Sequence, residues 1–310
     1  MRSSSAIYAL VPMSGTADDQ KRGLVLVFTS TLAYGAMPIF AKTTYEAGLE
    51  SVTLLAWRFV LATLLFALLP SRARPGLAWG DHARLWGIGS VFVGNAILYF
   101  EGLKRLPAST TAVIVYTYPV IVTLLSAAFG LEALTVRGVL AAVLAFSGCA
   151  LTAGGVVAGG RGVVFALASA FIYATYIVLC SRFIHGVPPD VASLHLAQVA
   201  TLGIGAWAWL HGGMALPRDP LAWLIVAAIA VLCTVVAMYA FLAGLYRVGP
   251  GRAAVLSSLE VLVTLALAYA FLGERLGPRQ AAGALLILGA VVLQNLGRWR
   301  RVERQRPPEI

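Results

Sequence analysis

The hydrophobic and polar positions divide the chain into ten apolar runs separated by short polar segments. Each run has about 17 to 25 residues, the length that an α-helix needs to cross the hydrocarbon core of a bilayer. Apolar runs of this length are typical of transmembrane helices. The predicted spans are residues 23–41, 51–69, 84–101, 108–129, 138–156, 162–181, 191–210, 221–245, 253–272 and 280–297.

The chain also contains an internal repeat. Residues 244–280, GLYRVGPGRAAVLSSLEVLVTLALAYAFLGERLGPRQ, match residues 102–138, GLKRLPASTTAVIVYTYPVIVTLLSAAFGLEALTVRG, at a shift of 142 positions. Identical pairs are Gly102/Gly244, Leu103/Leu245, Arg105/Arg247, Ala128/Ala270, Phe129/Phe271, Glu132/Glu274 and Arg137/Arg279. We therefore expect a disordered cytoplasmic N-terminus (1–22), two similar halves (23–157 and 162–297) and a basic cytoplasmic tail (298–310).

Each half holds five spans, and five is an odd number, so the second half must enter the membrane in the opposite sense to the first. The predicted fold is an all-α integral membrane protein with ten transmembrane helices in two inverted five-helix repeats. A site between two such repeats can open to either side of the membrane in turn, which indicates alternating access.

Composition excludes an ordinary soluble protein. Hydrophobic residues make up 60% of the chain and charged residues 12%, against about 25% charged in soluble domains. The net charge of +10 raises nucleic acid as a partner, but nearly all Lys and Arg lie between apolar runs or in the tail RWRRVERQR. That placement indicates membrane orientation and lipid contact, so we expect no nucleic-acid binding. Their excess on the side of the N-terminus predicts that both termini are cytoplasmic.

Several segments resemble the ten-helix EamA-like family of the drug/metabolite transporter (DMT) superfamily. The strongest are GNAILYFEGLKRLPASTTAVIVYTYPVIV, GLYRVGPGRAAVLSSLEVLV and LGERLGPRQAAGALLILGAVVL, with LAYGAMPIFAK and FIYATYIVLCSR in support. The resemblance implies movement of a substrate across the bacterial inner (plasma) membrane, often export of amino acids or other small metabolites. The chain departs from the family pattern at Val261, where Pro often follows Glu, and at Tyr34, where Trp is common.

Glu260 is the first candidate site residue, because it lies within the apolar run 253–272. A charged side chain at the bilayer centre costs about 2.5 to 3.5 kcal/mol on insertion scales, so this carboxyl group must be paired or protonated. It can carry a proton or balance a substrate amine. The alternative is a structural Glu, hydrogen-bonded to Ser257, Ser258 or a Tyr of another helix.

Arg58 lies inside the second predicted span. Its guanidinium stays charged and can bind a substrate carboxylate with two hydrogen bonds. It can instead reach the outer headgroups, or pair with a helix-end carbonyl or with a carboxylate such as Glu101.

Tyr118 is the repeat mate of Glu260, and two matched positions across a pseudo-two-fold axis suit a central site. Pro119 follows it and predicts a kink that frees a backbone carbonyl. Tyr116, Tyr99 and Tyr34 are further candidates for the lining of an amphipathic pocket. Aromatic packing without a ligand is the alternative for all four tyrosines.

Polar residues inside other spans complete the candidates. Asn95 lies inside a membrane span, where its polar side chain needs a hydrogen-bond partner. Either a polar cavity or a hydrogen bond to another helix supplies one. Gln198 lies one turn from His195 and deeper in the seventh span. We expect His82, His185 and His211 in loops without metal-ligand spacing, so we predict no metal and no cofactor. Glu132 and Glu274 are expected to be structural, accepting hydrogen bonds from the start of the next helix or pairing with Arg137 and Arg279.

These observations favour a secondary transporter, not an enzyme, that exports small metabolites such as amino acids by alternating access. It acts by uniport or by exchange with protons through Glu260, as a monomer or a homodimer. A non-transporting membrane partner or sensor subunit is the alternative. A membrane-embedded lipid-modifying enzyme would need clustered Asp, His or Ser at the membrane surface, and the sequence offers no such cluster.

Overall fold

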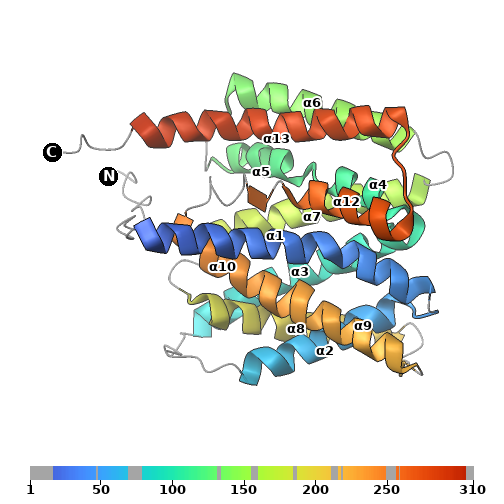
Figure 1. The fold of residues 1–310 in the computed structure, drawn as a ribbon. Helices are drawn as coiled ribbons and strands as arrows, with labels where there is room; N and C mark the ends of the chain where they lie inside the picture. The colour runs from blue at the N-terminus through green and yellow to red at the C-terminus, as the bar shows by residue number, and fades with distance from the viewer. Residues whose placement is uncertain are drawn as a thin grey trace.

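The computed structural model describes residues 17–46, 48–68, 79–130, 134–154, 160–183, 187–210, 216–217, 219–248, 256–257 and 259–304. Every regular element in these ranges is a helix (Figure 1). The helices are α1 (Ala17–Glu46), α2 (Ser51–Leu68), α3 (Trp79–Arg105), α4 (Ala108–Val115), α5 (Tyr118–Ala128), α6 (Val136–Gly154), α7 (Gly160–Phe183), α8 (Pro189–Leu210), α9 (Pro220–Ala230), the π-helix η1 (Val231–Val236), α10 (Ala237–Val248), α12 (Leu259–Leu272) and α13 (Pro278–Arg304).

The structure confirms an all-helical membrane protein. In the described part of the chain, seven helical segments are long and apolar enough to cross a bilayer. Three more apolar helices are shorter: Val136–Thr152, Leu259–Leu272 and Pro278–Leu293. Helix α1 begins at Ala17 and α13 continues to Arg304, so residues 17–22 and 298–304, which we expected in the terminal segments, are helical.

One predicted span is broken near its middle. Helix α4 ends at Val115, Tyr116 and Thr117 form a turn, and α5 begins at Tyr118 with Pro119 in its first turn. Proline is favoured there because the first N–H groups of a helix have no intrahelical partner. The residue therefore starts a second half-helix instead of kinking a continuous one. In the matching span of the second half, α12 begins at Leu259, one residue before Glu260.

The π-helix η1 interrupts another span, between α9 and α10. A π-turn shifts the hydrogen-bond pattern by one residue and is often found at functional sites. Here Thr234 donates its side-chain hydroxyl to the Ile229 carbonyl, five residues earlier. The same hydroxyl meets Arg58 of α2, so the interruption lies beside a buried charge.

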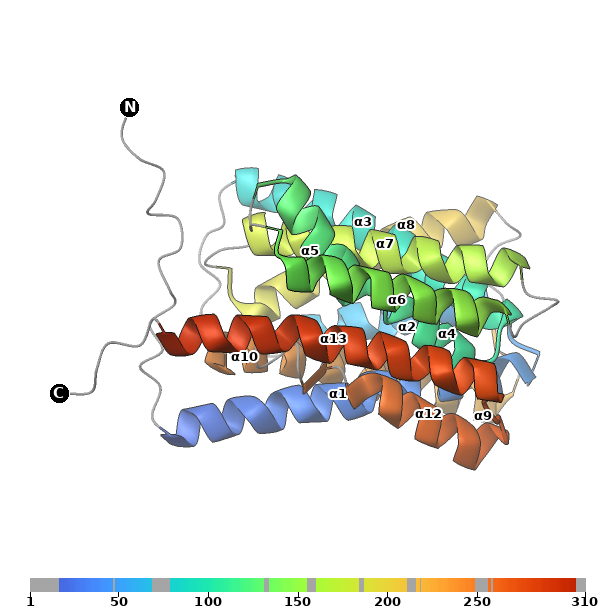
Figure 2. The ribbon, with the colours of Figure 1, turned by 90° about the horizontal axis from the view of Figure 1, so that it is seen from above.

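The helices of the two halves pack against each other throughout the bundle. Helix α6 packs on α13, α2 on α8, α3 on α7, and α1 on α10 and α12 (Figures 1 and 2). The start of α1 and the end of α13 lie at the same end of the bundle. The largest buried apolar cluster joins α2, α3, α8 and α9, around Leu54, Phe59, Phe100 and Ile229.

One sequence-based expectation on the histidines was wrong. His82 lies in α3 rather than in a loop, and its Nδ1 is 3.0 Å from Nε2 of His195 on α8. The His195 Nδ1–H donates to the Val191 carbonyl at 2.8 Å. His185, His211 and Glu132 lie outside the described residues.

Close packing of α6 on α13 predicts a strong effect of Gly283→Ala. A Cβ at Gly283 would lie 2.2 Å from Thr152 Oγ1 and 2.5 Å from the Gly148 carbonyl oxygen. Because that contact includes backbone, the two helices must separate, and we expect a loss of about 1–3 kcal/mol. The measurement is the melting temperature of the purified protein. Gly289→Ala on the same helix meets nothing within 4 Å and should leave the melting temperature unchanged or slightly raised.

Candidate functional site

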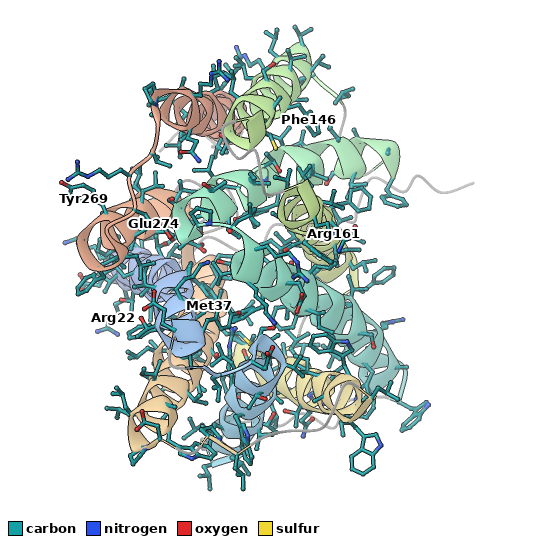
Figure 3. The ribbon with its side chains drawn as sticks, turned by 90° about the vertical axis from the view of Figure 1, so that its right-hand side faces the viewer. Arg22, Met37, Phe146, Arg161, Tyr269 and Glu274 are labelled. Atoms are coloured by element: carbon teal, nitrogen blue, oxygen red, sulfur yellow. The ribbon has the colours of Figure 1, made fainter. Side chains whose placement is uncertain are left out.

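A central pocket lies beside the break between α4 and α5 and the first turn of α12. Its volume is about 100 Å³, below the roughly 300 to 1,000 Å³ of sites for drug-sized ligands, so it suits a small metabolite. Residues from α1, α2, α3, α4, α5, α7 and α12 line it, together with Tyr116 of the turn between α4 and α5. Met37, one of these residues, is labelled near the centre of the bundle in the end-on view of Figure 3.

Most of the predicted site residues come together in this pocket. Those on its wall are Tyr34, Arg58, Asn95, Tyr99, Tyr116, Tyr118 and Glu260. Gln198 is not among the lining residues. It lies on α8, which packs against α2 and α3, and the structure therefore does not support including Gln198.

Aromatic rings form much of the pocket wall, and some of them contact one another. The rings of Tyr116 and Tyr118 meet edge to face at 5.2 Å between centroids. Those of Tyr118 and Tyr173 meet in the same manner at 4.8 Å. Edge-to-face pairs are stabilising, so the rings hold one another in place and offer a rigid apolar wall.

Arg58 is fixed on the wall of the pocket by η1 and by aromatic rings. Its side chain is 4% exposed, and its Nε–H donates to Thr234 Oγ1 at 2.6 Å. A second N–H donates to the Cys233 carbonyl at 3.5 Å, and the guanidinium carbon lies 4.8 Å from the Phe59 ring centroid. Arg58 therefore keeps its charge inside the bundle by hydrogen bonds and a cation–π contact.

Glu101, one of the alternative partners considered for Arg58, is engaged elsewhere. It pairs with Arg105 and accepts a hydrogen bond from Ser51 Oγ at 3.2 Å. Among the described residues, no ion pair within 4.0 Å involves Arg58. The guanidinium can thus serve a ligand carboxylate.

Glu260 lies in the first turn of α12, where the N-terminal end of a helix favours a negative charge. No ion pair of the described residues involves it. The Tyr116 hydroxyl donates to the Ser257 carbonyl just before α12, which ties the α4–α5 break to the start of α12. The pocket thus presents a carboxylate and a guanidinium without an ion-pair partner for either.

Asn95 takes both of the roles considered for it. Its Oδ1 accepts a hydrogen bond from Ser169 Oγ of α7 at 2.8 Å, and the residue also lines the pocket.

Thr264 of α12 was not predicted as a site residue. It lines the pocket, and its hydroxyl donates to the Gly35 carbonyl of α1 at 2.9 Å.

Glu274 has a partner that the sequence did not indicate. Instead of the next helix, α13, it binds the start of α4 in the other half of the chain. Its carboxylate accepts hydrogen bonds from the Ala108 N–H at 2.8 Å, the Ser109 N–H at 2.9 Å and Ser109 Oγ at 2.6 Å. Figure 3 shows Glu274 beside this helix end. The carboxylate therefore supplies the N-cap of α4 from across the molecule.

Among the described residues, no group of three or more His, Cys, Asp or Glu side chains could hold a metal ion. Phe59, Phe92 and Phe100 also line the pocket, although no sequence pattern distinguishes them from the other phenylalanines. The guanidinium of Arg58 lies over the rings of Phe59 and Phe100, and the ring of Phe92 meets that of Phe59 edge to face. These ring contacts depend on how the helices pack against one another.

Comparisons with known proteins agree with this architecture. The chain is 29% identical to the uncharacterized transporter YcbK of Bacillus subtilis, over 84% of this chain and 88% of that protein. It is 29% identical to the aromatic amino acid exporter YddG of Ancylobacter novellus, over 68% of this chain and 75% of that protein. A solved crystal structure, 24% identical, superposes with a TM-score of 0.64 over 91% of this chain and 99% of the other, which supports the fold alone.

The sequence profile of the EamA-like transporter family matches the chain twice, over residues 21–154 and again over residues 160–296. Together the two matches span most of the 310 residues. The protein belongs to the EamA-like transporter family of the DMT superfamily.

Proposed function

We propose that the protein exports small amphipathic metabolites, amino acids with aromatic side chains first among them, across the bacterial inner membrane. The observation that carries the proposal is the central pocket, which combines aromatic rings with a carboxylate and a guanidinium. The protein binds and releases its substrate without changing it covalently.

The pocket chemistry suits a zwitterion with an apolar body. Arg58 offers N–H donors to a substrate carboxylate, and Glu260 offers an acceptor to a substrate ammonium group. The rings of Tyr118 and Tyr173 provide faces and edges for an aromatic side chain. The relative named as an aromatic amino acid exporter supports this choice of substrate class.

Ten spans in two inverted repeats are part of the proposal. Gly102 of α3 closely approaches Gly162 and Ala166 of α7, while its repeat mate Gly244 of α10 closely approaches Gly23 and Val27 of α1. Matching contacts of this kind support a pseudo-two-fold relation between the halves, the arrangement on which alternating access depends. We place both termini in the cytoplasm, so that the end of the bundle holding Glu274 faces outward.

Proton exchange through Glu260 is the proposed means of coupling. A carboxyl group at this depth is stable when it is protonated or when it pairs with a substrate ammonium group or another cation. If proton and amine bind Glu260 in turn, a proton entering the cell drives an amine out of it.

A ligand screen tests the pocket. We expect aromatic amino acids or aromatic amines to raise the melting temperature of the purified protein. Tyr118→Ala should move the midpoint of this response to about two- to tenfold higher ligand concentration, because an aromatic contact contributes about 0.5–1.5 kcal/mol. Glu260→Gln should weaken it as well.

The matched control for the screen is Tyr269→Ala. Tyr269 lies on α12 with Glu260, but its side chain is 61% exposed and points away from the bundle (Figure 3). A response that survives both Tyr118→Ala and Glu260→Gln unchanged would contradict binding in the central pocket.

A further inference from the structure

A second, smaller cavity lies beside Glu260. The residues that it shares with the central pocket are Glu260, Tyr34, Tyr118 and Tyr173, and those that it adds are Ser30, Thr31, Phe241 and Ser257. Its volume is about 10 Å³. A cavity needs about 10–15 Å³ to hold one water-sized particle, so this one has room for a single small species and not for a substrate.

Ser30 provides an observation independent of the cavity itself. Its side chain is 1% exposed, and its Oγ has no hydrogen-bond partner among the described residues. An unpartnered hydroxyl in a membrane interior is costly, because neither lipid nor water satisfies it. A species in the cavity beside it would supply the missing partner.

The polar groups around the cavity are oxygen atoms that still have lone pairs available to bind a cation. Thr31 Oγ1 donates its hydrogen to the Val27 carbonyl at 2.9 Å, which leaves its lone pairs available. Ser257 contributes a side-chain hydroxyl. Its carbonyl oxygen accepts a hydrogen bond from the Tyr116 hydroxyl and has a second lone pair available. Carboxylate, hydroxyl and carbonyl oxygens are the ligands that hard cations prefer.

The charge balance also favours a cation. Glu260 has no ion-pair partner among the described residues. Arg58 lines the same pocket, but two of its N–H groups donate to Thr234 and to the Cys233 carbonyl instead. An ionised carboxylate at this depth needs a positive partner. In other membrane transporters, interrupted helices present carboxylates and freed carbonyls to coupling ions in the same manner.

We propose that this cavity binds one unhydrated alkali-metal cation, held by Glu260 and by oxygens of Ser30, Thr31 and Ser257. The cation occupies Glu260 in the ionised state, as a proton does in the neutral state. Its role as a coupling ion rests on the proposed transport function, because a cation and a substrate ammonium would then compete for one carboxylate. Its binding does not rest on that function.

The test uses sodium as the probe and the melting temperature of the purified protein without substrate. Sodium chloride is compared with N-methylglucamine chloride at equal ionic strength, since the organic cation is too large for the cavity. We expect sodium to raise the melting temperature with a saturable concentration dependence. Glu260→Gln should abolish the rise, and Ser30→Ala should move its midpoint to about tenfold higher sodium.

Thr29→Val is the matched control. Thr29 is the neighbour of Ser30 on α1, is exposed, and bonds the Val25 carbonyl as Thr31 bonds that of Val27. It should respond to sodium like the natural protein. An equal response to both salts, a sodium response that persists in Glu260→Gln, or a Ser30→Ala midpoint equal to the natural one would overturn the proposal.

The two proposals fail separately. Sodium binding is measured in the absence of substrate, so a protein that transported nothing would still show it. The ligand screen is run in N-methylglucamine chloride, so substrate binding to the central pocket is measured without sodium.

Discussion

Glu260→Gln should abolish substrate efflux driven by a pH gradient, lowering it to the level of empty liposomes. Gln keeps the size of the side chain and its capacity to accept hydrogen bonds, but it can neither take up a proton nor pair with an ammonium group. The helix start at Leu259 and the contact between Tyr116 and Ser257 remain possible, so folding should be preserved. The measurement is efflux from proteoliposomes with an imposed pH difference in sodium-free buffer.

The control for this experiment is Glu46→Gln, because Glu46 lies at the exposed end of α1, outside the pocket. It should transport at the natural rate. Proton-driven efflux that persists in a folded Glu260→Gln protein would contradict proton exchange through this residue.

Glu274→Ala should open the outward end of the protein. The substitution removes three hydrogen bonds at the start of α4, of 2.8, 2.9 and 2.6 Å, and the negative charge that favours a helix N-terminus. We expect a loss of about 1–3 kcal/mol, because two backbone N–H groups lose their acceptor. This favours the state in which α4 and α12 are apart.

A cysteine placed at Thr110 reports on this change. Thr110 is buried in the first turn of α4 and accepts a hydrogen bond from Gln280 at 3.1 Å. In a Thr110→Cys background, Glu274→Ala should raise the rate of labelling by a membrane-impermeant thiol reagent about tenfold or more. Glu50→Gln breaks the exposed pair with Lys104 at the same end and should have little effect. Equal labelling rates in the two variants would show that Glu274 does not hold this end closed.

The helical spans could be predicted because lipid leaves the backbone no alternative. Segments such as 51–69 and 191–210 became α2 and α8 with nearly the same bounds, since every N–H in the bilayer must find an acceptor within its own segment. The placement of Tyr118 and Glu260 at matched half-helix starts also agrees with the repeat in the sequence.

Other features depend on packing between distant segments. The cap that Glu274 gives to α4 joins residues 166 apart, and nothing in the local sequence distinguishes it from a cap on α13. The bond from Arg58 to Thr234 depends on where η1 lies against α2. Gln198 lies outside the lining of the central pocket. The hydrophobic pattern gives the depth of a residue in the membrane, but not which face of its helix meets the pocket.

Counterflow shows whether the protein alone moves substrate through its pocket by alternating access. Proteoliposomes holding the purified protein are loaded with an unlabelled aromatic amino acid and diluted into a trace of the labelled form. We expect transient accumulation of label above its external concentration in these proteoliposomes and none in empty liposomes. A protein that binds the amino acid in the ligand screen but accumulates no label would contradict alternating access.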